Sequence, residues 1–190
     1  MKNLVIFASG SGSNAEKIFE YFKDSNEVLI THIFSNNPEA GVISRAERLA
    51  IPCTIFTRSE YKDGTLLKKI QSLNTQWVIL AGFLWLIPTE FIQAFPQRIV
   101  NLHPALLPKF GGKGMYGHFV HEAVKAAGEF ETGITIHWVN EHYDEGKTIA
   151  QYRCEVLPQD NASDIAFKIH QLEQKFVPST IEQVINNEIN

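Results

Sequence analysis

The chain has 190 residues, 44% of them hydrophobic and 20% charged, with a formal net charge of −4. This composition fits one globular domain over residues 1–190, and the negative charge argues against a nucleic-acid or anionic-membrane partner. No apolar run is long enough to span a bilayer and no secretory signal opens the chain, so we expect a cytoplasmic protein. Cys53 and Cys154 lack metal-type spacing and are expected to be buried free thiols.

Residues 3–8 are nearly all apolar, which predicts a strand buried on both faces of a parallel sheet. The segment Ser9-Gly10-Ser11-Gly12-Ser13-Asn14 follows, and a helical pattern comes next. A strand, a Gly/Ser loop and a helix start present backbone N–H groups to a phosphate, so we interpret this loop as a site for a phosphorylated small molecule. A tight turn without a ligand is the alternative.

A dinucleotide site is a further interpretation of the same loop, because Gly10, Gly12 and Ala15 have the spacing of that fingerprint. The predicted second strand, residues 28–34, argues against it. That strand is followed by Ser35-Asn36-Asn37 and not by the acid that usually binds the ribose hydroxyls of a nicotinamide cofactor.

The middle of the chain alternates predicted helices at residues 42–50, 63–73 and 88–95 with predicted strands at residues 54–56 and 77–81. Alternation of this kind predicts a doubly wound parallel α/β sheet, whose ligands bind at the carboxyl ends of the strands. The aromatic segment at residues 82–88 lies at such an end. It forms either plain core or the floor of a pocket for a flat heterocycle.

The next predicted strand, residues 98–100, leads into Asn101-Leu102-His103-Pro104-Ala105-Leu106-Leu107-Pro108. Alternate residues of a strand share a face, so Asn101 and His103 are expected to point the same way. An amide and an imidazole held together in this way suit the polarisation of a carbonyl group. A structural His at a strand–loop junction is the alternative.

The last third of the chain predicts a mobile, glycine-rich loop at residues 110–117, with Lys109 and Lys113 available to an anion, and a helix at residues 120–127. His118 and His121 are interpreted as solvated or loop-packing side chains and not as metal ligands. Strands at residues 133–139 and 149–156 flank an acidic loop and predict an antiparallel end to the sheet. Ser163 is expected to cap a long last helix that carries Glu173 and bends near Pro178.

The Gly/Ser loop, the Asn101–Pro108 segment and the Asp144-Glu145-Gly146 loop together resemble the phosphoribosylglycinamide formyltransferase family, nearly end to end. The resemblance implies a Rossmann-like formyltransferase fold and transfer of a formyl group from 10-formyltetrahydrofolate to the amine of glycinamide ribonucleotide in purine biosynthesis. Both are small-molecule substrates, and no metal, nucleic acid or membrane is implied. The resemblance does not fix the oligomeric state, and a homodimer is compatible with it.

Position by position, the resemblance implies three groups of site residues. Catalysis falls to Asn101, His103 and Asp144. Substrate binding falls to Gly12, Ser13, Asn14 and Glu173. Binding of the folate falls to Arg58, Leu84, Trp85, Leu86, Ile87, Asn101 and the loop from Glu141 to Lys147, which includes Asp144.

The chain departs from the family pattern at Ala105, where a Ser is common, at Trp85 and in the glycine-rich loop. Four alternative functions stay open, one of which is a phosphate- or nucleotide-binding module without catalytic activity. A 10-formyltetrahydrofolate hydrolase would use the same trio on water, but usually carries an extra N-terminal domain, and a methionyl-tRNA formyltransferase would need a C-terminal RNA-binding module. A nicotinamide-dependent oxidoreductase would use the Gly/Ser loop instead.

Overall fold

The computed structural model describes residues 1–187. The chain forms two compact units, an N-terminal unit of residues 1–101 and a C-terminal unit that begins at Leu102. The expected single domain stays a prediction.

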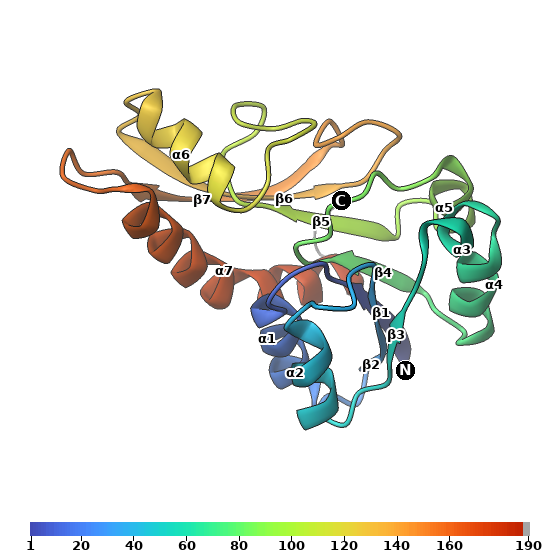
Figure 1. Cartoon of the computed structure of the whole chain (residues 1–190). Coiled ribbons are helices and arrows are strands. Elements are labelled where there is room, and N and C mark those ends of the chain that lie inside the picture. Colours follow the sequence, from blue (N-terminus) through green and yellow to red (C-terminus); the bar gives the residue numbers. More distant parts are fainter. Residues whose placement is uncertain (188–190) are drawn as a thin grey trace. The chain divides into compact units, whose positions relative to one another are not determined.

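The N-terminal unit alternates strands and helices (Figure 1). Its strands are β1 (Lys2–Phe7), β2 (Val28–Ser35), β3 (Cys53–Ile55), β4 (Trp77–Leu80) and the first part of β5 (Ile99–His103). Its helices are α1 (Ser13–Phe22), α2 (Val42–Arg48), α3 (Arg58–Lys62), α4 (Thr65–Ser72) and α5 (Thr89–Ala94). The strand pairs of this unit are parallel, as the alternation predicts.

The centre of this unit is β1, whose residues from Leu4 to Phe7 are fully buried. The Phe7 ring lies 5.3 Å from the Phe34 ring and 5.2 Å from the Phe83 ring, centroid to centroid. Burial of each such side chain stabilises a fold by about 1.5–3 kcal/mol. The continuous apolar run therefore fixes β1 in the middle of the sheet, with its carboxyl end at the Gly/Ser loop.

The C-terminal unit holds the end of β5, then α6 (His118–Ala126), β6 (Glu131–Trp138), β7 (Thr148–Glu155) and α7 (Ala162–Ile185). Strands β6 and β7 pair antiparallel, with Ile134 opposite Tyr152. Helix α7 packs on both strands and on α6. Over the described residues, the strand order is β3-β2-β1-β4-β5-β6-β7, so the predicted mostly parallel sheet with an antiparallel end is confirmed.

Three expectations are wrong in detail. Helix α7 is capped by Asn161, whose side chain accepts from the Ser163 and Asp164 N–H groups, and not by Ser163. The helix expected at residues 63–73 begins at Thr65, and the short helix α3 before it was not predicted. Cys53 and Cys154 are free, as expected, but only partly buried.

Candidate active site

His103 is the last residue of β5 and is 3% exposed. Its Nε2 lies 2.7 Å from the carbonyl oxygen of Phe110, and because a carbonyl only accepts, Nε2 is the donor. Its Nδ1 lies 3.4 Å from Oδ2 of Asp144. The strand end and the Phe110 carbonyl thus fix the imidazole ring with one edge toward a carboxylate.

Asp144 has a left-handed backbone, with φ of 58°, in the loop between β6 and β7. Its Oδ2 accepts the Gly112 N–H at 2.9 Å, and its Oδ1 lies 3.6 Å from Nε2 of His137. The side chain of Asp144 is 10% exposed and that of His137 2%. One carboxylate is therefore held between two buried imidazoles, in a place where a negative charge is well compensated.

The surroundings of Asp144 and His103 lower the pKa values of both side chains. Burial by itself raises the pKa of Asp144, but the hydrogen bond from His137, the charge of His103 and the Gly112 N–H together hold that pKa below its usual value. Burial lowers the pKa of His103, against the opposing pull of Asp144 and the Phe110 carbonyl. At neutral pH the lowered pKa values favour an ionised Asp144 carboxylate beside a neutral His103 imidazole.

His137 is oriented from its other side, because its Nδ1 lies 2.8 Å from the Trp138 carbonyl oxygen. Only glycine fits at position 146, since a Cβ there would lie 1.7 Å from the same carbonyl oxygen. His137 thus supports the acidic loop through its contact with Asp144.

A threonine and a glutamine that the sequence analysis missed hold the segment after His103. Thr135 Oγ1 donates to the Ala105 carbonyl at 2.6 Å and accepts the Leu107 N–H at 3.0 Å. Gln151 Nε2 donates to the Leu107 carbonyl at 2.9 Å. Only the pairing of β6 with β7 brings these side chains to the segment, so no local sequence signal marks them.

Asn101 lies in β5 two residues before His103 and is partly exposed. Asn101 is the last residue of the N-terminal unit, whereas His103 belongs to the C-terminal unit. The strand interpretation of this segment is confirmed, and the catalytic role of Asn101 stays a prediction.

The Gly/Ser loop has its predicted place between β1 and α1. Gly12 has φ of 78°, and a Cβ at this position would lie 2.5 Å from Val42, so only glycine fits. Ser13 and Asn14 form the start of α1 and are partly exposed. At the loop's first residue, the Ser9 hydroxyl donates to Asn36 Oδ1 at 2.7 Å. The loop is therefore rigidly built against its neighbours.

The residues expected on the folate side lie in both units. Trp85 is partly exposed between exposed Leu84 and Leu86, and Ile87 is buried. The Arg58 guanidinium lies 5.1 Å from the centre of the Trp85 ring, so the structure brings together two residues that the sequence analysis named separately. Tyr61, which the sequence analysis did not name, donates its hydroxyl to the Leu86 carbonyl at 3.0 Å.

The remaining predicted residues belong to the C-terminal unit. Glu141 is exposed in the loop after β6. Glu173 lies on α7 with its side chain 13% exposed, and its Oε2 is 3.6 Å from Nδ1 of His170. His118 is exposed, as expected, but His121 is buried on α6 at 6% exposure, so the solvated interpretation is wrong for His121.

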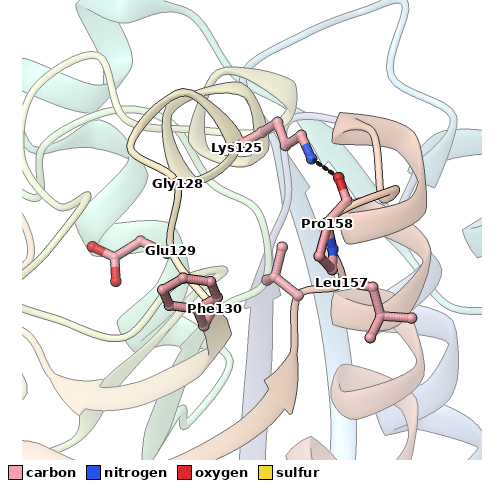
Figure 2. Close-up of a pocket in the computed structure, with 7 residues that line it drawn as sticks. Lys125, Gly128, Glu129, Phe130, Leu157 and Pro158 are labelled. Atoms are coloured by element: carbon pink, nitrogen blue, oxygen red, sulfur yellow. Dashed lines mark hydrogen bonds between the residues drawn. The ribbon is translucent and has the colours of Figure 1, made fainter.

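A hollow of about 160 Å³ lies elsewhere in the C-terminal unit (Figure 2). It contains none of the predicted site residues. Its floor is closed on one side by the hydrogen bond from Lys125 Nζ to the Pro158 carbonyl, at 2.8 Å. It is lined by Lys125, Gly128, Glu129, Phe130, Val156, Leu157 and Pro158.

Within residues 1–187, no group of three or more His, Cys, Asp or Glu side chains is arranged to hold a metal ion. Nor does any helix in this part of the chain have the length and apolar character needed to cross a membrane.

The family model described as "Formyl transferase" matches residues 2–181 of the chain. A relative from Arabidopsis thaliana, "Phosphoribosylglycinamide formyltransferase, chloroplastic", is 38% identical, over 99% of this chain and 67% of the relative. The "Phosphoribosylglycinamide formyltransferase" of Bacillus subtilis is 35% identical, over 97% of this chain and 95% of the relative.

Solved structures agree with these sequence matches. The crystal structure of phosphoribosylglycinamide formyltransferase from Anaplasma phagocytophilum superposes with a TM-score of 0.90 at 28% identity, over 99% of this chain and 88% of that one. The enzyme of the same name from Bacillus halodurans gives 0.88 at 30% identity, over 97% and 95% of the two chains.

Proposed function

Because the chain belongs to the formyl transferase family, among the phosphoribosylglycinamide formyltransferases, we propose that it transfers the formyl group of 10-formyltetrahydrofolate to the amine of glycinamide ribonucleotide. The products are formylglycinamide ribonucleotide and tetrahydrofolate, in the biosynthesis of purines. The observation that carries the proposal is the approach of Asp144 Oδ2 to His103 Nδ1 at 3.4 Å, at the carboxyl end of a parallel strand.

The first chemical step is attack of the substrate's uncharged amine on the formyl carbon, which turns the carbonyl oxygen into an oxyanion. Asn101 stabilises that oxyanion by donating its amide N–H, and His103 stabilises it by the positive charge of its protonated ring. Removal of one such contribution typically costs about 2.7–4 kcal/mol of barrier. Since burial lowers the pKa of His103, the ring takes up its proton from water as the oxyanion forms and releases it when the oxyanion collapses.

The second step breaks the bond between the formyl carbon and the folate nitrogen. The amine loses one proton as it becomes an amide, and the leaving nitrogen gains one. Asp144 is ionised before the reaction because its pKa lies below the usual value, so its carboxylate is free to accept the amine's proton, and it becomes ionised again when it passes that proton through a water to the leaving nitrogen. The same charge favours the protonated form of His103.

Two further sets of residues bind the substrate and the folate. The loop of Gly12, Ser13 and Asn14 receives the phosphate, and Glu173 binds the substrate near its glycinamide. Arg58, the segment from Leu84 to Ile87, Asn101 and the loop from Glu141 to Lys147 receive the folate, with the two exposed leucines offering an apolar surface to the pterin. One domain and a cytoplasmic location are further predictions, and a homodimer is compatible with the resemblance.

The test follows the absorbance change on deformylation of 10-formyltetrahydrofolate, with and without glycinamide ribonucleotide. Turnover that requires the ribonucleotide is expected. Turnover with water alone would make the protein a hydrolase, and no turnover in either case would contradict the enzymatic proposal.

Single variants then test the trio. Asn101→Ala, His103→Ala and Asp144→Ala should each lower turnover by about 100-fold or more, while circular dichroism shows a retained fold. His118→Ala is the control, because this histidine is exposed on α6 and pairs with Glu122 at 3.1 Å. Near-native turnover of His103→Ala would remove its proposed role.

A further inference from the structure

Three consecutive carbonyl groups of the Gly/Ser loop are each held by a donor. The Gly10 carbonyl accepts the Val42 N–H at 3.1 Å, and the Gly12 carbonyl accepts the Glu16 N–H at 2.9 Å. Between them, the Ser11 carbonyl accepts from Nε of Arg45 at 2.8 Å. The loop therefore has its carbonyl dipoles anchored to α1 and α2.

The anchored carbonyls determine where the N–H groups of the loop point. The peptide bonds here are trans, and in a planar trans peptide the C=O and N–H vectors are opposed. The N–H groups of Ser11, Gly12 and Ser13 consequently point away from those three donors. Backbone N–H groups at the start of a helix attract anions.

Arg45 is the one side chain among these three donors, since Val42 and Glu16 use backbone N–H groups that any residue but proline supplies. Its guanidinium also pairs with the carboxylate of Glu16, and Arg48 pairs with the other oxygen of the same carboxylate. Glu16 lies in the first turn of α1 with its side chain 14% exposed. Without a cationic partner, this carboxylate would repel a phosphate at the loop.

We infer that Arg45 is a positioning residue for the phosphate of the substrate, which keeps the Ser11 carbonyl turned away from the anion and neutralises Glu16. The inference rests on the proposed function, because it needs a phosphorylated substrate at the Gly/Ser loop. It assigns Arg45 no contact with the reacting atoms, so its loss should weaken binding and leave the chemical step intact.

Arg45→Met and Arg48→Met form a matched pair. Both remove a partner of Glu16, but only Arg45 bonds to Ser11. Arg45→Met should raise the KM for glycinamide ribonucleotide about tenfold or more, because a charge-assisted hydrogen bond is lost, with kcat within about twofold. Arg48→Met should change KM by less than about threefold, since Arg48 is an exposed partner.

Glycinamide riboside, which lacks the phosphate, separates this effect from a general loss of activity. Its kcat/KM should be the same for the native protein and Arg45→Met, because the loop then has no anion to bind. A KM for the ribonucleotide that is equal in the two methionine variants would overturn the inference. Absence of turnover in the native protein would instead contradict the proposed function.

Thermal unfolding of each variant shows whether Arg45→Met folds. If it does not, Arg45→Lys carries the test, because it keeps a positive charge beside Glu16 but lacks the planar Nε–H that reaches Ser11. A KM at least about threefold above the native value is expected for Arg45→Lys, and a native KM would overturn the inference.

Discussion

At the scale of single residues, Asp144 determines the protonation of its neighbour. Its charge is the largest of the influences that raise the pKa of His103 against the effect of burial. Asp144→Asn keeps the shape and removes the charge, so the pKa of His103 should fall further below its usual value. A titration of the histidine ring protons by NMR measures this directly, and turnover at neutral pH should fall by about 100-fold or more.

His32 serves as the internal reference in the same spectra. Burial lowers the pKa of His32 too, but its Nε2 contacts Thr54 Oγ1 at 2.7 Å and not Asp144. Its titration should therefore be identical in the native protein and in Asp144→Asn. A His103 curve that stays in place or moves to higher pH would show that Asp144 does not stabilise the imidazolium.

At the scale of elements, the loop from Phe110 to Gly117 holds two members of the proposed trio through its backbone alone. Gly112 and Gly114 have φ of 95° and 92°, and a Cβ at either position would meet no atom within 4 Å. Alanine should thus cost both positions a similar backbone strain, of about 1–2 kcal/mol. Of these two glycines, Gly112 donates its N–H to Asp144, so Gly112→Ala should lower kcat about tenfold more than Gly114→Ala.

Chemical denaturation shows whether the two variants are equally destabilised, and steady-state kinetics then compares their kcat values. Equal kcat at equal stability would mean that the loop does not position Asp144. The mobility that the sequence analysis expects of this loop is a separate question.

The elements predicted best from the sequence are those whose place depends mainly on the burial of apolar side chains. β1 and β4 are nearly continuous apolar runs that need burial on both faces, and each was predicted to within about a residue of its bounds. α3 was missed because five residues are too few to show a helical period, although its capping box of Thr57 and Glu60 was readable. At α7, Asn161 and Ser163 are both good caps, and the reciprocal bonds with Asp164 favour Asn161.

The residues of the candidate site also fall into those that could be found from the sequence and those that could not. Asn101 and His103 were found because their side-chain chemistry and strand spacing are visible in the sequence. Gly112 and Arg45 were missed because their partners are distant in the chain: the Gly112 N–H donates to the Asp144 carboxylate, and the Arg45 side chain donates to the Ser11 carbonyl. Which carbonyl an arginine reaches is decided by helix packing, which no short spacing encodes.

At the scale of the whole molecule, buried histidines link stability to pH. Burial first, then the charges of His118 and His103, lower the pKa of His121 to about 4 from an ordinary 6.5. His121 of the unfolded chain therefore binds a proton as the pH falls below 6.5, whereas His121 of the folded chain binds it only near pH 4. The stability that depends on neutral His121 is complete above pH 6.5 and is lost as the pH falls through this window.

His121→Gln removes this titration and keeps a polar side chain on α6, where Nδ1 of the native imidazole has no hydrogen-bond partner within residues 1–187. Between pH 6.5 and about 4, the free energy of unfolding of the variant should fall with pH less steeply, by up to about 1.4 kcal/mol per pH unit, the effect of one proton. The buried imidazoles of His32 and His103, whose pKa values are also lowered, keep the remaining slope positive. Urea unfolding at a series of pH values measures both slopes. A constant difference in stability at every pH would show that His121 matters for packing alone and not for acid sensitivity.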